Sequence, residues 1–361
     1  MCPRQPAWRS AQTDSRPLAG QRATMLPGQA VPALRSQRWK TVGKDGTMRL
    51  VTYTLRGWTS VGVVDDGLII DVPRAYAMLL ADRGVSDAPG RALAECPPDL
   101  VTLLARDGLE RAREVAAAVI EQLPDKRDRF AAAGIIAALD DPAVQLRPPL
   151  LRPDKIICLG LNYADHAAES GAAVPQYPEL FSKFPSTLIG PGEPIVLPRV
   201  SQQVDYEAEL AVVIGRPGRF IPADRALDYV AGYTILNDIS MRDFQFRGRQ
   251  WLPGKTFDRS TPVGPWLVTA DEVPDPQNLT ITTEVSGAVL QHSNTREMIF
   301  PVAETIAYLS QIVQLVPGDL IATGTPAGVG FARKPPRFLQ PGDVVRVTIE
   351  RVGTLEKPGR G

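Results

Sequence analysis

The stretch Gln203–Gly215, QVDYEAELAVVIG, places three carboxylates at alternate positions and then becomes continuously apolar. This pattern predicts a β-strand, and because side chains alternate between the two faces of a strand, Asp205, Glu207 and Glu209 would point the same way. Carboxylates about 6–7 Å apart on a partly covered face repel one another and lose hydration unless a cation lies among them. Hard divalent ions such as Mg²⁺ or Mn²⁺ prefer oxygen ligands of this kind. The stretch therefore predicts a divalent-metal site, and the simpler alternative is a solvated strand face.

A possible base lies upstream of this stretch. Residues 155–162, KIICLGLN, predict a short apolar strand, and the following NYADHAAESG places His166 and Glu169 three residues apart on one helical face. A carboxylate beside an imidazole favours the charged ring and orients it as a base. The alternative is an incidental pair on a surface helix. The other histidine, His292, lies in a polar QHSNT segment, and we expect it to be structural or exposed.

A further acidic residue, Asp238, ends the next predicted strand, AGYTILND. Because carboxylates at strand ends commonly face clefts, Asp238 could complete a three-carboxylate metal site with Glu207 and Glu209.

The polar run after Asp238, SMRDFQFRGRQWLPGKTFD, brings Arg242, Gln245 and Lys255 close together. Arg and Lys are the natural partners of carboxylates, so the run predicts a site for an anionic substrate. Further along, the Gly-rich loop 324–330 does not match a nucleotide-binding P-loop, because no Lys, Ser or Thr follows in register. Its backbone amides and Thr325 could still bind a carboxylate.

The composition is that of an ordinary globular protein, with 361 residues, 44% of them hydrophobic and 22% charged. The formal net charge is zero, which gives no electrostatic case for nucleic acid or an anionic membrane as partner. No apolar run approaches the roughly 18 residues that a membrane-spanning helix needs. Three scattered cysteines do not suit a disulfide framework or a zinc site. A reducing, cytoplasmic location fits best.

The chain divides into three predicted parts. The first part is the segment 1–47, which we expect to be disordered. Its first 40 residues contain six arginines and one lysine but a single acidic residue. Such a leader is either a mitochondrial transit peptide of a eukaryotic protein or an extension upstream of a true start at Met25 or Met48, the reading we favour. Residues 48–150 predict a small α+β domain, with a β-meander followed by helices near 75–80, 99–105 and 108–123. The Pro-rich 145–153 predicts a linker to a second domain, 151–361.

Several separated stretches together resemble the fumarylacetoacetate hydrolase family. They are LGLNYADHAAE, VDYEAELAVVIG, NDISMRDFQ, WLPGKTFD and TGTPAGVG followed by RKPPRFLQPGD. They occur in the family's order across roughly residues 150–355, which is more specific than any single motif. The RKPPRFLQPGD ending and SKFPSTLIGP are most similar to the members known as FAH-domain-containing proteins of the second type.

The resemblance implies a role for each candidate residue. The Mg²⁺ or Mn²⁺ ligands would be Glu207, Glu209 and Asp238, with Asp205 off the metal. His166 and Glu169 would form a water-activating dyad. Gln245 and Lys255 would donate hydrogen bonds to developing negative charge. Arg242 and Thr325 would bind the substrate.

The resemblance also implies a fold and an activity. The fold would be a β-rich α+β catalytic domain of rolled, packed mixed sheets with a small N-terminal α+β domain, assembled as a homodimer. We expect a metal-dependent hydrolase that cleaves a C–C bond in a 2,4-dioxo acid such as an acylpyruvate or fumarylpyruvate. The alternatives are a 2-oxo acid decarboxylase or isomerase, acting on oxaloacetate or a 2-hydroxyhepta-2,4-diene-1,7-dioate, and a non-catalytic module that binds a metal or small molecule.

Overall fold

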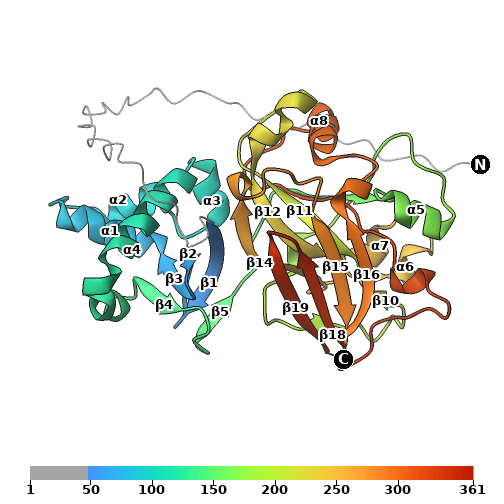
Figure 1. Cartoon of the computed structure of the whole chain (residues 1–361), viewed down its shortest axis with the longest axis horizontal. Helices are drawn as coiled ribbons and strands as arrows, with labels where there is room; N and C mark the ends of the chain where they lie inside the picture. Colours follow the sequence, from blue (N-terminus) through green and yellow to red (C-terminus); the bar gives the residue numbers. More distant parts are fainter. Residues whose placement is uncertain (1–47, 361) are drawn as a thin grey trace, which may run out of the picture. The chain divides into compact units, whose positions relative to one another are not determined.

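The structure of the protein, a computed structural model, describes residues 48–360 (Figure 1). The predicted disordered leader, residues 1–47, lies outside the described residues. Within the described range, every helix is too short or too polar to cross a bilayer.

The N-terminal part contains the predicted meander and four helices. The antiparallel strands are β1 (Arg49–Leu55), β2 (Trp58–Asp65) and β3 (Leu68–Asp71). The helices are α1 (Val72–Asp82), α2 (Ala88–Glu95), α3 (Leu100–Ala105) and α4 (Leu109–Ala132), and two short strands follow, β4 (Ile136–Ala138) and β5 (Val144–Leu146). The sequence predicted three of these helices and missed α2. It also ended α4 too early, because the helix continues through Pro124.

Aspartates set the start of three of these helices. The carboxylates of Asp71, Asp87 and Asp99 each accept a hydrogen bond from the backbone N–H three residues ahead. Such a cap satisfies a donor that the first helical turn leaves without a partner. The cap at Asp87 and the proline after it were the signals that could have revealed α2.

One large mixed sheet dominates the described chain. Its path is β4-β3-β2-β1-β14-β12-β11-β17-β6-β7, with β5 beside β1 and β8 beside β14. The strands not yet given are β6 (Ile156–Gly160), β7 (Glu179–Ser182), β8 (Leu188–Ile189), β11 (Ala208–Ile214), β12 (Val230–Asn237), β14 (Thr261–Thr269) and β17 (Leu320–Ala322). Neighbours run antiparallel except in the pairs β6–β17 and β8–β14. Because β1 pairs with β14, the first strands continue the sheet of the following part, and a domain boundary at residue 150 stays a prediction.

Strand β11 explains why the sequence around it is so apolar. Ala211 and Val213 belong to the hydrophobic cluster that includes the helices of residues 72–132, whereas Leu210 and Val212 belong to a second cluster. A strand buried on both faces reads as a continuous apolar run. Glu209 shares its parity with Ala211 and is 1% exposed, so its carboxylate is carried into the interior.

A second sheet and a helix complete the fold. The five-stranded sheet has the order β16-β15-β18-β19-β9, and its strands β15 and β18 contact β11 and β12, respectively. Its strands are β9 (Ile195–Val196), β15 (Thr280–Val285), β16 (Ala288–Asn294), β18 (Val344–Ile349) and β19 (Gly353–Arg360). The strands β15 and β16 form an antiparallel hairpin, and α8 (Val302–Ile312) follows it. The strand-rich α+β class is therefore confirmed.

Short elements surround the acidic strand. They are α5 (Ala164–Ser170), α6 (Arg242–Gln245), α7 (Leu252–Lys255), the paired strands β10 (Val204–Asp205) and β13 (Ser240–Met241), and the 3-10 turns η1 (Pro185–Thr187), η2 (Ala223–Tyr229), η3 (Ala270–Glu272), η4 (Thr295–Glu297) and η5 (Gly330–Ala332). The expectation of one uninterrupted strand over 203–215 is wrong, because Tyr206 and Glu207 separate β10 from β11.

Candidate active site

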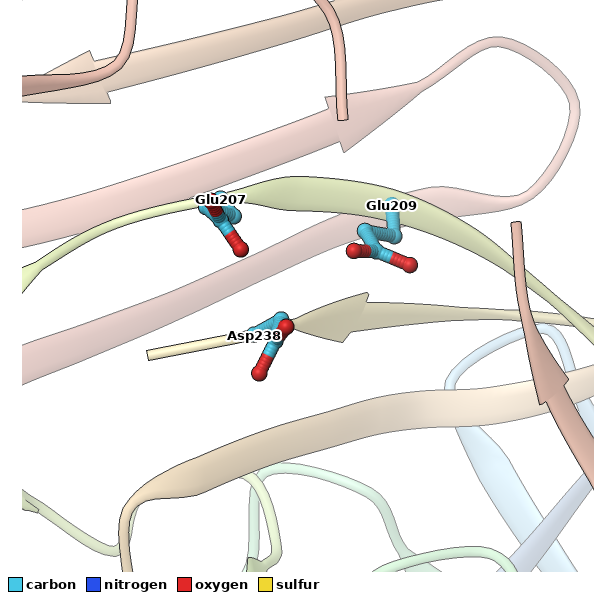
Figure 2. Close-up of side chains that lie close together, drawn as sticks. All are labelled: Glu207, Glu209 and Asp238. Carbon is cyan, nitrogen blue, oxygen red and sulfur yellow. The ribbon is translucent and has the colours of Figure 1, made fainter. Parts of the chain in front are cut away.

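Three carboxylates meet where β11 begins and β12 ends. The antiparallel register places Ala208 opposite Asn237, and the Asp238 backbone N–H donates to the Glu207 carbonyl at 2.8 Å. As Figure 2 shows, Glu207, Glu209 and Asp238 turn toward a common space. One carboxylate oxygen from each lies within 4.8 Å of the others, and all three residues are buried. The sequence therefore grouped these three residues correctly.

Cationic side chains hold two of the three carboxylates. Lys255 Nζ lies 2.5 Å from Glu207 Oε2 and 2.6 Å from Asp238 Oδ2. Arg242 Nη2 donates to Glu207 Oε1 at 2.6 Å, and Lys183 Nζ donates to Asp238 Oδ1 at 2.6 Å. Burial alone would raise the pKa of Glu207, but Arg242 and Lys255 overcome this and hold it below its ordinary value.

The carboxylate of Glu209 has different electrostatic surroundings from those of Glu207 and Asp238. Its Oε2 accepts a hydrogen bond from the Gly324 N–H at 2.8 Å, and no lysine or arginine among residues 48–360 forms an ion pair with it. Burial, and the negative charges of Asp238 and Glu207, raise the pKa of Glu209 well above its ordinary value. A buried carboxylate beside two others, without a cation of its own, fits a divalent metal ion.

Asp205 lies outside the group of three carboxylates that could hold a metal ion. Its fully buried carboxylate accepts hydrogen bonds from Arg242 Nε at 2.9 Å and from the backbone N–H groups of Gly330 and Phe331 at 2.7 and 3.0 Å. Among the described residues, four buried carboxyl groups thus face three cationic side chains in this region, so one carboxyl group, that of Glu209, has no ion-pair partner. This count supports the same divalent site.

The predicted dyad forms on α5. His166 Nδ1 lies 3.3 Å from Glu169 Oε2, and both Glu169 oxygens accept from the Gly328 N–H at 3.0 and 3.1 Å. Because the Glu169 carboxylate is an acceptor, a hydrogen bond at this contact requires a hydrogen on His166 Nδ1. The contact also fixes the orientation of the imidazole ring relative to Glu169.

The Gly-rich loop positions the protein's own carboxylates. Its amides at Gly324, Gly328 and Gly330 donate to Glu209, Glu169 and Asp205, respectively. The pattern of small residues predicted carboxylate binding by this loop, and these three bonds show which carboxylates it holds. The hydroxyl of Thr325 accepts from Gln291 Nε2 at 2.8 Å.

Several of these groups border one cavity of about 240 Å³. Its polar lining includes His166, Glu207, Glu209, Arg242, Gln245, Lys255 and Thr325, and its apolar lining includes Phe181, Phe246, Trp251 and Phe331. The guanidinium of Arg242 lies 4.4 Å from the centroid of the Phe331 ring and donates to Gln245 Oε1 at 2.9 Å.

Sequence reasoning missed Lys183 and the aromatic lining of this cavity. Lys183 lies in a segment between predicted elements, and its contact with Asp238 spans 55 residues of sequence. No spacing signal marks such a contact, since it depends on which strands become neighbours.

Comparisons with known proteins identify the family of this chain. Residues 155–358 match the family described as "Fumarylacetoacetate (FAA) hydrolase C-terminal". The chain belongs to the fumarylacetoacetate hydrolase family and is an enzyme of that superfamily, which includes both hydrolases and isomerases.

Three relatives within this family are similar to this chain over most of their own length. Over 228 residues, 63% of this chain and 73% of the relative, it is 50% identical to the oxaloacetate tautomerase Fahd2a, mitochondrial, of Rattus norvegicus. It also resembles a solved fumarylacetoacetate hydrolase from Exiguobacterium antarcticum, with 34% identity, a TM-score of 0.70, and coverage of 87% of this chain and 99% of that one. A maleylpyruvate hydrolase from Sphingobium sp. SYK-6, solved with manganese(II) and pyruvate, has 31% identity, a TM-score of 0.61, and coverage of 87% and 99%.

Proposed function

We propose that this protein interconverts the enol and keto forms of a small 2-oxo dicarboxylic acid of the oxaloacetate type. The supporting observation is that His166 lines the same cavity as Glu207 and Glu209 of the acidic triad, in a chain half identical to oxaloacetate tautomerases over that region. Tautomerisation requires removal of a proton from the carbon next to a carbonyl and stabilisation of the resulting negative charge on oxygen.

Glu207, Glu209 and Asp238 would hold Mg²⁺ or Mn²⁺. When bound, such an ion supplies Lewis-acid polarisation of the carbonyl oxygen. The solved maleylpyruvate hydrolase that this chain resembles contains manganese, which supports a divalent ion without choosing between the two.

His166 is assigned the proton transfer. Its Nε2 takes a proton from C3 of the keto acid, and the proton returned to the carbonyl oxygen gives the enol, so no atom is gained or lost. Glu169 keeps Nδ1 protonated and the ring oriented. Lys255 and the amide nitrogen of Gln245 supply donors to the oxygen that gains charge.

Arg242 and Thr325 are assigned to the substrate carboxylates. Arg242 already donates through Nε, Nη1 and Nη2, once each. A guanidinium carries five N–H donors, so one hydrogen on each terminal nitrogen remains for an anionic ligand.

The predicted C–C hydrolase of 2,4-dioxo acids is the second candidate. The specific observation in its favour is the oriented His166–Glu169 dyad, which can equally deprotonate water, together with the resemblance to a maleylpyruvate hydrolase.

One assay separates the two candidates. The full chain with Mg²⁺ or Mn²⁺ is given enol oxaloacetate, and then acetylpyruvate, and the absorbance of each is followed with an EDTA control. The first proposal expects metal-dependent loss of the oxaloacetate enol without pyruvate release. Cleavage of acetylpyruvate to pyruvate and acetate, with no effect on enol oxaloacetate, would replace it by the second.

The two histidines provide a matched pair of variants for that assay. His166→Asn is expected to lower kcat about a hundredfold or more, since general bases contribute about 10²–10⁴-fold. His292→Asn is expected to leave it unchanged, because His292 lies on the exposed face of β16 beside Thr282. Equal losses in both variants would contradict the assignment.

We also propose a homodimer, as the family resemblance implied, and a cytoplasmic location, or a mitochondrial one if the leader is a transit peptide. Light scattering of the purified chain tests the first, and imaging of a tagged full-length chain tests the second.

A further inference from the structure

A second hollow lies beside the active-site cavity. We call it the outer groove. It has a volume of about 450 Å³ and is lined by Glu179, Leu180, Phe181, Ser182, Arg249, Gln250, Trp251 and Leu252. Phe181 and Trp251 line both hollows, so these two side chains form the wall between them.

Trp251 is seated firmly in this wall. Its six-membered ring lies against the backbone of Gly160, where a Cβ atom would come within 2.0 Å of Cζ3 and 2.5 Å of Cη2. The absence of a side chain at Gly160, the last residue of β6, is therefore what makes room for the indole.

Phe181 also packs against the indole of Trp251. The two ring centroids are 5.7 Å apart in an edge-to-face arrangement, and the Lys255 ammonium lies 4.8 Å from the centroid of Phe181. Such contacts are favourable for aromatic rings and for a cation over an aromatic face. The wall is thus packed against Lys255, whose ammonium group binds Glu207 and Asp238.

The enclosed volume suits a small substrate. Pockets for drug-sized ligands usually measure about 300–1,000 Å³, and the active-site cavity of about 240 Å³ is smaller. The space that a larger substituent would need exists next to it, behind the wall, where Arg249 and Gln250 offer polar groups.

We propose that Trp251 sets the upper size limit of the substrate by closing the active-site cavity toward the outer groove. This inference rests on the proposed function for the identity of the reaction, but the wall itself acts on any 2-oxo acid. Small acids such as oxaloacetate fit in front of the indole, and acids with a bulky group on C3 collide with it.

The test compares a small and a bulky 2-oxo acid. For the metal-loaded full chain, kcat/KM is measured for tautomerisation of oxaloacetate and of phenylpyruvate. Trp251→Ala is expected to raise the phenylpyruvate-to-oxaloacetate ratio about tenfold or more, the scale on which pocket volume discriminates substrates. Trp251→Phe should give a smaller change, and Trp58→Ala, which removes a partly exposed indole elsewhere, should give none. An unchanged ratio in Trp251→Ala overturns the proposal.

Gly160→Ala provides an independent arm. Its Cβ forces the indole from its seat in the wild-type background, so it should change the ratio there and have little further effect in Trp251→Ala. Additive effects of the two substitutions count against the wall. If Trp251→Ala is too unstable to assay, the ratio in Gly160→Ala alone decides, and an unchanged ratio there overturns the proposal.

Binding separates this inference from the proposed function. If the wild-type protein tautomerises neither acid, the proposed function fails, and calorimetric titration with pyruvate and phenylpyruvate still tests the wall. A gain in affinity for phenylpyruvate relative to pyruvate in Trp251→Ala supports it, and equal relative affinities overturn it.

Discussion

At the scale of single residues, the two glutamates of the acidic strand have opposite electrostatic situations. Glu207 accepts from Arg242 and Lys255, whereas Glu209 accepts from the Gly324 N–H. Without metal, ionised Glu207 is therefore stabilised by its surroundings and ionised Glu209 is not.

This contrast predicts opposite effects of the same substitution. In metal-free protein at neutral pH, Glu207→Gln is expected to lower the free energy of unfolding by about 3–5 kcal/mol, because it removes one of the two carboxylates that each of the buried cations Arg242 and Lys255 contacts. Glu209→Gln is expected to raise the melting temperature, because it removes a buried carboxyl group whose ionisation the surroundings disfavour and keeps an acceptor for Gly324. Thermal melts in EDTA check both, and a Glu209→Gln protein as destabilised as Glu207→Gln would contradict the charge assignment.

The raised pKa of Glu209 predicts a pH dependence in the metal-free protein. Because the folded-state pKa lies above the unfolded one, the contribution of Glu209 to stability is complete below the ordinary glutamate pKa and is lost as pH rises through the folded-state value. Melting temperatures in EDTA should therefore fall over that range in the wild type more than in Glu209→Gln. If the melting temperatures of the two proteins instead change with pH in parallel, folding does not raise the pKa of Glu209.

Addition of a divalent metal ion tests the same two glutamates as ligands. Mg²⁺ or Mn²⁺ should raise the melting temperature of the wild type, since a ligand that binds only the folded state stabilises it. In Glu207→Gln and Glu209→Gln this increase should be lost. An unchanged increase in either variant would remove that residue from the proposed ligand set.

At this scale the sequence revealed much of the site. Alternating carboxylates and a histidine–glutamate spacing of three are local patterns, and they led to Glu207, Glu209, His166 and Glu169. Lys183 has no local pattern, because its contact with Asp238 exists only after β7 and β12 take their places in the sheet.

At the scale of elements, the loop after β17 determines the orientation of the dyad. The Gly328 N–H donates to both oxygens of Glu169, and Gly328 has a φ of +103°. A Cβ there would also lie 2.0 Å from the Leu290 carbonyl oxygen.

Gly328→Ala is therefore expected to displace the loop, to lower kcat about tenfold or more, and to destabilise the protein by about 1–3 kcal/mol. The control is Gly342→Ala, since Gly342 has a φ of +91° but no atom within 4 Å of the added Cβ. Activity assays and thermal melts of the two variants distinguish backbone strain, which both variants introduce, from displacement of the loop, which only Gly328→Ala introduces. Equal activity in both would contradict a role for Gly328.

Element types were predictable where the pattern was long or strongly periodic, as in the β1–β3 meander and α4. Errors arose where local rules compete. Pro124 suggested the end of a helix that tertiary packing carries on to Ala132, and the apolar 203–215 run concealed the break between β10 and β11.

At the scale of the whole molecule, residues 48–150 share both a sheet and a core with the rest. β1 pairs with β14, and the hydrophobic cluster of Leu50 and Val115 also contains Val213 and Leu320. The sequence could not predict this continuity, because it depends on a pairing across more than half of the chain.

Removal of residues 48–150 is therefore expected to give a fragment, 151–361, that aggregates. It would expose the edge of β14 and one face of the sheet core, both of which promote association. Solubility and circular dichroism of the fragment check this. A soluble, cooperatively melting fragment would instead establish the predicted boundary at residue 150 as a true domain boundary.

The parallel pairing of β6 with β17 has a consequence for how the enzyme folds. Asn162, just after β6, donates to the Thr323 carbonyl just after β17, across 161 residues of chain. Contacts of such large sequence separation form slowly, since the intervening chain must first lose conformational freedom. During synthesis, α5 leaves the ribosome long before the loop that orients Glu169. Catalytic competence is thus gained only in the last stage of folding, and enzyme activity reports completion of the native state more stringently than helix or strand content does.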